Sequence, residues 1–269
     1  MEKHLTSLSN PTIKQAVQLK HKARERKAQG LFIAEGLREV KLALNNGFEA
    51  THLFYDPEQT PEPVVDQVLE NASIPPASLI TVSENVMGKI AYRSSVPNVV
   101  GIFKNKVVTG LHPAVRSSQL LILVLEGIEK PGNLGAILRT ADAAGVDAVF
   151  VCEPGFDLFN PNAIRASLGA IFTQPIFELS SQVAATYLKE HHISIHATYL
   201  EAAKPLYECD LGKATALVLG AEASGITDFW VEQADERIII PMSGQVDSMN
   251  VSASAAIVLF EAVRQRRAI

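Results

Sequence analysis

Cysteine is scarce in this 269-residue chain, which contains only Cys152 and Cys209. Because the two have no CxxC spacing, neither a disulfide framework nor a zinc site is indicated. Long apolar runs are missing as well, since none approaches the roughly 18 residues that a membrane span needs. The first residues, MEKHLTSLSN, lack the apolar region of a signal peptide. We therefore expect a cytoplasmic protein that has neither a metal nor a membrane partner.

Charged residues are sparse, at 20%, whereas 47% of residues are hydrophobic, which predicts a folded chain with a large core. The net charge of −5 is unevenly spread: residues 1–117 carry a formal charge of +3, and the remainder carries −8. Residues 1–27 alone hold seven Lys and Arg residues against two acidic ones. A basic stripe of this kind is typical of a phosphate-binding surface, although most charge runs are only the solvated face of a helix.

The first hundred residues alternate short strand-like and helical stretches. Asn10 and Pro11 have the residue types of a helix cap and a first helical position. Strand-like runs at 32–35, 51–55, 79–82 and 98–103 alternate with helical spacing at 37–44 and 64–69. This pattern predicts a small α/β domain over residues 1–105. Gly, Pro and Ser in the stretch that follows predict a linker over 106–117.

Strand and helix alternate more strongly over residues 118–269. The near-continuous apolar run QLLILVL, at 119–125, is typical of a parallel strand buried on both faces. We expect further strands at 148–152, 193–199, 216–219 and 237–240, and helices at 134–144, 163–168, 182–191 and 251–267. The sequence therefore predicts a doubly wound parallel α/β domain.

Three segments place small and polar residues where strands of this domain should end. They are PGNLGAILRTADAAG at 131–145, LVLGAEASGI at 217–226 and IIIPMSGQVDSMNVSASAA at 238–256. In an open α/β sheet, ligands bind at the carboxyl ends of the strands. We therefore expect the three segments to form one site.

The three segments resemble, in order and spacing, the three motifs of the SpoU (TrmH-type) branch of the SPOUT RNA methyltransferases. That family transfers a methyl group from S-adenosylmethionine to a ribose 2′-hydroxyl of RNA. The segments LTSLSNPTIKQAVQLKHKAR and LFIAEGLREV resemble the substrate-binding domain that often precedes it in ribosomal-RNA methyltransferases. The resemblance implies a trefoil knot, in which the stretch 241–251 passes through an earlier loop, and a homodimer formed by the C-terminal domain.

Arg139 takes the place of the catalytic arginine in motif one, which contacts the 2′-hydroxyl or the adjacent phosphate. Because a guanidinium stays protonated, we expect it to clamp phosphate and stabilise alkoxide charge rather than to act as a base. The matching role of Asn133 is to position this arginine. On the residues alone, Arg139 could be a surface arginine and Asn133 only a helix cap.

The resemblance also assigns catalytic roles to Glu222 in motif two and to Ser248 and Asn250 in motif three. On their own, Glu222 could be a helix-start carboxylate, and Ser248 or Asn250 could simply cap the last helix. Gly220 permits a close approach of the backbone to a ligand. The positions implied for binding the methyl donor are Leu219, Gly220, Ile240, Met242 and Met249. Those expected to bind RNA are Lys14, Lys22, Arg24, Arg26 and Arg165.

The sequence therefore predicts an S-adenosylmethionine-dependent RNA 2′-O-methyltransferase, with ribosomal RNA as the favoured substrate. A transfer-RNA methyltransferase and a non-catalytic RNA-binding module are the alternatives. An oxidoreductase on a doubly wound sheet would need GxGxxG after the first strand, and this chain has only Gly132 and Gly135 there.

Overall fold

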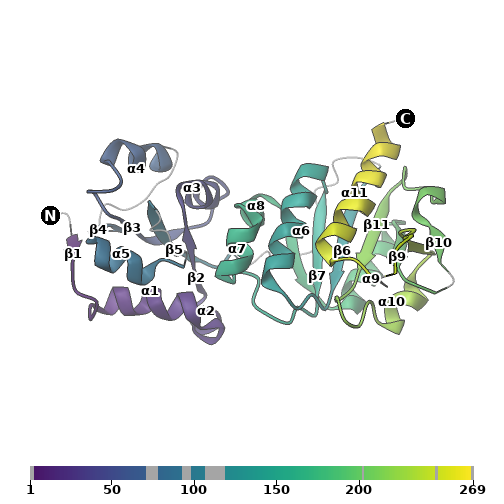
Figure 1. The fold of residues 1–269 in the computed structure, drawn as a ribbon, viewed down its shortest axis with the longest axis horizontal. Coiled ribbons are helices and arrows are strands. Elements are labelled where there is room, and N and C mark those ends of the chain that lie inside the picture. The colour runs from purple at the N-terminus through teal and green to yellow at the C-terminus, as the bar shows by residue number, and fades with distance from the viewer. Residues whose placement is uncertain are drawn as a thin grey trace. The chain divides into compact units, whose positions relative to one another are not determined.

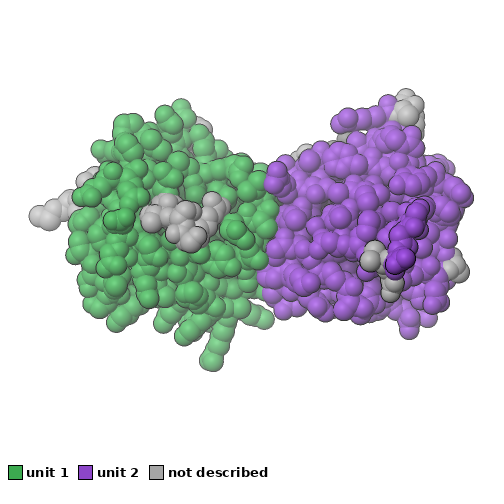
Figure 2. Space-filling view, in the orientation of Figure 1, with its two compact units in different colours: residues 1–107, 157–173 green, residues 108–156, 174–269 purple. Residues whose placement is uncertain are grey.

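The computed structural model describes residues 3–70, 78–92, 98–106, 119–201, 203–245 and 248–267. The chain forms two compact units (Figure 2). Unit 1 comprises Met1–Val107 and Asp157–Thr173, and unit 2 comprises Val108–Phe156 and Gln174–Ile269. The predicted linker lies outside the described residues from position 107 onward.

Unit 1 contains a mixed five-stranded sheet with strand order β1-β4-β3-β5-β2 (Figure 1). The strands are β1 (Lys3–Leu5), β2 (Leu31–Glu35), β3 (Ala50–Tyr55), β4 (Leu79–Val82) and β5 (Val99–Lys104). The pairs β1–β4 and β3–β4 are parallel, whereas β5 runs antiparallel to both β3 and β2. The predicted α/β class is correct for this unit.

Among the described residues before position 107, the helices of unit 1 are α1 (Pro11–His21), α2 (Ala23–Gln29), α3 (Leu37–Asn45), α4 (Glu62–Leu69) and α5 (Glu84–Ile90). The Thr12 backbone N–H donates to Asn10 Oδ1 at 2.9 Å, so the predicted helix cap is present. Lys22 is extended, with φ −117° and ψ 107°, and separates α1 from α2. The basic stripe therefore lies on two short helices.

Residues 157–173 come from the second half of the chain but pack within unit 1, as α7 (Pro161–Ser167) and α8 (Ala170–Thr173). Phe32 of β2 stacks on Phe159, with ring centroids 4.3 Å apart, and on Phe172 at 5.8 Å. Arg26 of α2 forms an ion pair with Asp157. The packing units are therefore discontinuous in sequence, and helical spacing cannot reveal which sheet a helix packs against. The domain bounds 1–105, 106–117 and 118–269 stay a prediction.

Unit 2 contains seven parallel strands in the order β10-β12-β9-β11-β6-β7-β8. They are β6 (Leu121–Glu126), β7 (Ala148–Cys152), β8 (Ile176–Leu179), β9 (Ser194–Thr198), β10 (Lys204–Pro205), β11 (Thr215–Leu219) and β12 (Glu236–Ile239). Every residue of β6 and β11 is buried, as the near-continuous apolar runs predict. The predicted parallel sheet is confirmed.

Helices cover both faces of this sheet. They are α6 (Pro131–Ala144), α9 (Ser181–Glu190), α10 (Asp228–Gln233) and α11 (Val251–Arg267), and a 3₁₀ turn, η2, spans Leu206–Glu208. Ile122 and Val124 of β6 pack in one core with Leu188 of α9 and Trp230 of α10. Because alternate residues of a strand point to opposite faces, Leu121, Leu123 and Leu125 of β6 point toward α6 and α11, which pack side by side (Figure 1).

No described helix is both long and apolar enough to cross a membrane.

Candidate active site

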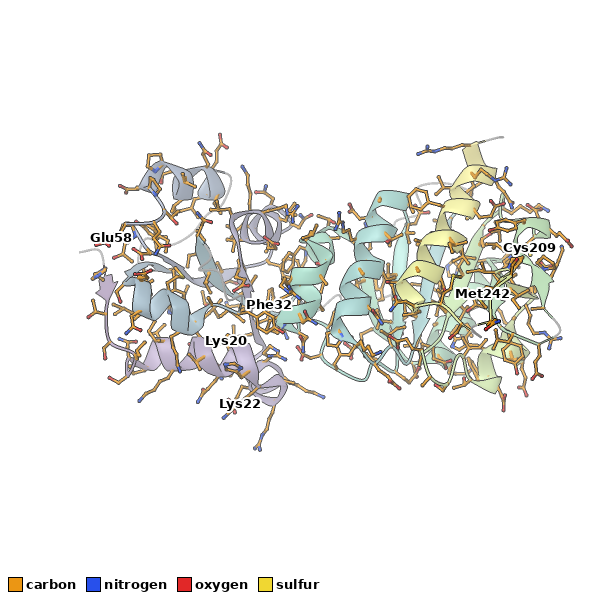
Figure 3. All side chains as sticks on the ribbon, in the orientation of Figure 1. Lys20, Lys22, Phe32, Glu58, Cys209 and Met242 are labelled. Atoms are coloured by element: carbon orange, nitrogen blue, oxygen red, sulfur yellow. The ribbon has the colours of Figure 1, made fainter. Side chains whose placement is uncertain are left out.

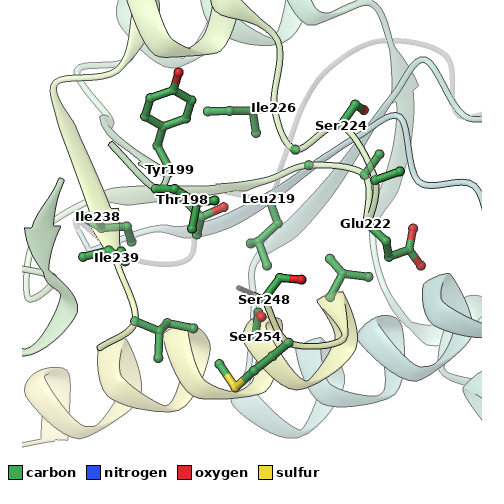
Figure 4. Close-up of a pocket in the computed structure, with 18 of the residues that line it drawn as sticks. Thr198, Tyr199, Leu219, Glu222, Ser224, Ile226, Ile238, Ile239, Ser248 and Ser254 are labelled. Carbon is green, nitrogen blue, oxygen red and sulfur yellow. The ribbon is translucent and has the colours of Figure 1, made fainter. Parts of the chain in front are cut away.

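A pocket of about 480 Å³ opens at the carboxyl ends of three neighbouring strands of unit 2, β12, β9 and β11 (Figure 4). It is enclosed by the loops that follow these strands and by the start of α11. Its lining residues are Thr198, Tyr199, Leu200, Glu201, Leu219, Gly220, Ala221, Glu222, Ala223, Ser224, Gly225, Ile226, Ile238, Ile239, Ile240, Met242, Ser248, Met249, Val251 and Ser254. Motifs two and three therefore meet at this pocket, whereas none of the described residues of motif one, 131–145, lines it.

All five positions predicted to bind the methyl donor line this pocket: Leu219, Gly220, Ile240, Met242 and Met249. The stretch 198–201, at the end of β9 and just after it, forms another part of the wall and was not predicted. The signal was present, since this stretch also follows a buried strand, but it carries none of the family motifs.

The motif-two loop is closed by its own backbone. The Ala221 N–H donates to the Gly225 carbonyl oxygen at 3.0 Å, and the Gly225 N–H donates back to the Ala221 oxygen at 2.9 Å. Gly225 has φ +66°, a conformation that favours glycine. A Cβ on Gly220 would lie only 2.1 Å from the carbonyl carbon of Gly225. Gly220 is therefore needed for this internal contact, and not only for the approach of a ligand.

A chain of side-chain hydrogen bonds connects the three motifs. Asn133 Nδ2 donates to Glu222 Oε1, and Asn250 Nδ2 donates to Asn133 Oδ1 at 3.3 Å. Glu222 Oε2 is buried and has no hydrogen-bond partner among the described residues. The helix-cap interpretation of Asn133 is wrong, because Lys130 is at the cap position of α6.

Asn250 caps the last helix and also contacts motif one. Its Oδ1 accepts hydrogen bonds from the Ser252 backbone N–H at 2.9 Å and from the Ser252 hydroxyl at 2.5 Å, so it caps α11. Its Nδ2 reaches motif one at the same time. Ser248 is exposed and lines the pocket.

Arg139 is exposed on α6 and does not line the pocket. Within the described part of the chain its guanidinium has no hydrogen bond or ion pair, so all its donors remain available to a substrate. The surface position of Arg139 thus agrees with both interpretations of this residue.

The residues predicted to bind RNA are all in unit 1 but differ in exposure. Lys14, Lys22 and Arg24 are exposed (Figure 3 labels Lys22). Arg165 is also exposed and donates to Asn162 Oδ1 at 3.0 Å.

Arg26 does not fit the prediction, because only 3% of it is exposed. Its Nε and Nη2 donate to the two carboxylate oxygens of Asp157 at 2.9 and 2.6 Å, and its Nη1 donates to the Leu19 carbonyl oxygen at 2.6 Å. A charge can be buried when it is paired in this way. Arg26 therefore stabilises the packing of residues 157–173 within unit 1 and is not an exposed phosphate contact.

The pocket suits an apolar ligand that carries positive charge. Leucine, isoleucine and methionine side chains form much of its wall, and its charged lining residues are Glu201 and Glu222. No Lys, Arg or His is among the described residues that line it, which disfavours a dinucleotide with its pyrophosphate. S-adenosylmethionine, with its adenine and its sulfonium, fits this set of groups. No described cluster of His, Cys, Asp or Glu could hold a metal ion.

Two parts of the chain match known protein families. Residues 120–260 match the SpoU rRNA Methylase family, and residues 10–101 match the MRM3-like substrate binding domain. The first match covers more than half of the chain and contains all three motifs.

Two solved structures are similar over nearly the whole chain. An RNA 2′-O ribose methyltransferase is 36% identical, with a TM-score of 0.83 over 98% of this chain and 99% of that one. An AdoMet-bound rRNA methyltransferase from Sinorhizobium meliloti is 30% identical, with a TM-score of 0.85 over 97% of each chain.

The 23S rRNA (guanosine-2′-O-)-methyltransferase RlmB of Escherichia coli K12 is 43% identical over 150 residues. This match covers 55% of the present chain and 61% of the relative, so it spans less than two thirds of that protein. The family predicted from the three motifs is thereby confirmed. The chain belongs to the SpoU rRNA methylase family, and it is a methyltransferase of that family.

Proposed function

We propose that this protein transfers a methyl group from S-adenosylmethionine to a ribose 2′-hydroxyl of structured ribosomal RNA. The observation that carries the proposal is the joining of the three motifs by Glu222, Asn133 and Asn250 beside the pocket. The names of two similar proteins support the reaction, since one is an RNA 2′-O ribose methyltransferase and the other acts on guanosine of 23S rRNA.

Leu219, Ile240 and Met249 would surround the adenosine, and their apolar side chains would exclude water from it. S-adenosylmethionine supplies an electrophilic methyl group on a positively charged sulfur. Glu201 and Glu222 place negative charge on the same wall, which favours a cationic ligand. The binding of AdoMet by the Sinorhizobium meliloti relative supports this assignment.

A ribose 2′-hydroxyl is a poor nucleophile, so its position and the loss of its proton limit the reaction. Correct alignment of reacting groups supplies about 7–11 kcal/mol in well-oriented systems. Arg139 would hold the adjacent phosphate and stabilise negative charge on the hydroxyl oxygen as the carbon–oxygen bond forms. Asn133 would fix the position of the start of α6, and hence of this arginine, relative to motif two.

Unit 1 would bind the RNA, with Lys14, Lys22, Arg24 and Arg165 as phosphate contacts. Their exposure and the match of residues 10–101 to a substrate binding domain support this role. The functional division would then be an RNA-binding unit, to which 157–173 contribute, and a methyltransferase unit. Structured RNA is read mainly through its shape, its phosphates and its 2′-hydroxyls.

Three further predictions belong to this proposal. They are the trefoil knot around residues 241–251, a homodimer formed by the methyltransferase unit, and a cytoplasmic location.

The test is a map of ribose 2′-O-methylation in ribosomal and transfer RNA of cells that lack the gene. The gene is then restored as wild type, as Arg139→Ala, or as Arg267→Ala, a control that removes another exposed arginine of unit 2. We expect one ribosomal-RNA site to disappear on deletion and to return with wild type and Arg267→Ala, but not with Arg139→Ala. A lost site in transfer RNA would change the substrate. An unchanged map would support a non-catalytic RNA-binding protein.

A further inference from the structure

A carboxylate is buried beside the pocket and belongs to none of the three motifs. Glu126 is the last residue of β6 and is only 6% exposed. A buried carboxylate is costly unless hydrogen-bond donors satisfy its oxygens. The identity of its donors therefore shows which part of the fold Glu126 holds in place.

Both oxygens of Glu126 accept from one residue, Thr227. The Thr227 backbone N–H donates to Oε2 at 2.8 Å, and the Thr227 hydroxyl donates to Oε1 at 2.8 Å. Thr227 is at the cap position of α10, yet its side chain makes no capping hydrogen bond. The hydroxyl instead completes a two-point attachment to the end of β6.

The Ser181 hydroxyl also lies near Glu126 but donates to another carboxylate. Ser181 Oγ lies 2.7 Å from Glu153 Oε2 and 3.2 Å from Glu126 Oε1. It has one proton, which the shorter contact assigns to Glu153, and the Ser181 backbone N–H also donates to Glu153, at 3.0 Å. Glu153 therefore fixes the start of α9, whereas Glu126 fixes Thr227.

Thr227 directly follows the motif-two loop, Gly220–Ile226, every residue of which lines the pocket. This loop is therefore attached at two places to the part of the chain that leads into and through motif one. Near its beginning Glu222 accepts from Asn133, and just past its end Thr227 donates to Glu126. Between these attachments the backbone pairing of Ala221 and Gly225 sets the shape of the loop.

We infer that Glu126 is a positioning residue for the methyl donor: its attachment to Thr227 keeps the motif-two loop in the conformation that binds S-adenosylmethionine. The inference rests on the proposed function, because it names a determinant of the same pocket. Glu126 does not line the pocket, so it acts through the loop and not by contact with the ligand.

Glu126→Gln is the most direct variant because it keeps the size of the side chain. It replaces one acceptor oxygen by an amide N–H₂ and removes the negative charge, so the hydrogen bonds to Thr227 are no longer charge-assisted. Hydrogen bonds to charged groups are the stronger class, and we expect the Kd for S-adenosylmethionine to rise by about tenfold or more. The KM for S-adenosylmethionine should rise in step, while kcat at saturating donor stays close to the wild-type value.

Two substitutions test Thr227, the residue that donates to Glu126: Thr227→Val and Thr227→Ser. Thr227 is exposed, so either substitution can be made without disturbing the core. Thr227→Val removes the hydroxyl and should weaken donor binding, whereas Thr227→Ser retains the hydroxyl and should bind as the wild type does. Glu153→Gln is the matched control, since it changes the other carboxylate at Ser181 without touching Thr227. It should leave the Kd unchanged.

Calorimetric titration of the full-length protein with S-adenosylmethionine, at a temperature where every variant is folded by circular dichroism, measures these values. A Kd unchanged in both Glu126→Gln and Thr227→Val would overturn the inference, as would an equal loss in Glu153→Gln. The Thr227 pair decides the question even where Glu126→Gln does not fold. If the wild type itself binds no S-adenosylmethionine, the proposed function fails instead, which is a distinct result.

Discussion

The two units use charge in opposite ways. In unit 1 the exposed cations Lys14, Lys22 and Arg24 lie on α1, on α2 and at their junction, within residues 10–101, which match a substrate binding domain. In unit 2 the charged residues found in the described lining of the pocket, Glu201 and Glu222, are both acidic. The net charge of −5 averages these two surfaces and predicts neither of them.

The difference fits a two-substrate reaction. A polyanionic RNA needs cations that can release its counterions, whereas a sulfonium donor needs an apolar pocket with negative charge nearby. Arg139 is one of several exposed cations of unit 2, and it is the one that motif one predicts to be catalytic. Because it does not line the pocket, we predict that it contacts RNA and not the donor.

The largest predicted effect concerns Arg139. Arg139→Ala should lower kcat for RNA methylation by about 10²–10³-fold, the usual loss when one stabilising donor is removed from a transition state. The Kd for S-adenosylmethionine should not change, because Arg139 does not line the pocket. Single-turnover methylation and donor titration measure the two quantities separately. A variant that turns over normally would contradict the catalytic role.

The second prediction compares a buried, paired cation of unit 1 with an exposed one. Arg26→Met leaves Asp157 without its partner, and breaking a buried pair in this way costs about 3 kcal/mol of unfolding free energy. Lys22→Met, at an exposed position between α1 and α2, should leave stability unchanged. Denaturant titration of both variants gives the comparison. Equal stability of the two would show that the Arg26 pair does not hold unit 1 together.

Local patterns predicted much of unit 2. The apolar run of β6, the strand β7 and the bounds of α11 follow from continuous burial and helical spacing, which are local properties. The position of the pocket followed from the rule that ligands bind at the carboxyl ends of parallel strands. The short strand β10 and the helix α10 were not predicted, because two and six residues carry too little periodicity.

The remaining differences concern contacts between distant parts of the chain. Arg26 belongs to a basic run and looks exposed in the sequence, yet Asp157, 131 positions away, buries it. Residues 157–173 have ordinary helical spacing, but Phe159 and Phe172 complete the core of unit 1 around Phe32. The bond from Asn133 to Glu222 joins positions 89 apart. Such pairs depend on the tertiary fold and leave no mark on local spacing.

The third prediction tests the basic surface itself. Replacing Lys14, Lys22 and Arg24 together by Gln should weaken RNA binding and flatten its dependence on salt. Each lost phosphate contact reduces the slope of log K against log salt by about 0.7–0.9, so three contacts remove about 2. Donor binding should be unaffected.

A second triple variant serves as its control. Lys189, Lys213 and Arg267 are exposed residues of unit 2, and changing them to Gln removes the same net charge. Filter-binding titrations across a range of salt concentrations compare the two. The same loss of slope in both triples would show that total charge, and not the surface of unit 1, attracts the RNA.

The smallest effect concerns a group that unit 2 keeps neutral. Burial lowers the pKa of His196 below its ordinary value, although Glu236, whose Oε2 lies 3.5 Å from Nδ1, acts in the opposite direction. Burial prevails, because Nδ1 accepts or donates no hydrogen bond among the described residues. The unfolded chain therefore binds a proton at a higher pH than the folded chain does. The stability contributed by neutral His196 is complete above the ordinary histidine pKa of about 6.5 and is lost as pH falls toward the lowered value.

Thermal unfolding measured between pH 7.5 and 5 should show this loss of stability in the wild type. His192→Gln, a control at an exposed position, should lose as much stability, and His196→Leu should lose less. A pH dependence that His196→Leu leaves unchanged would assign the titration to another group.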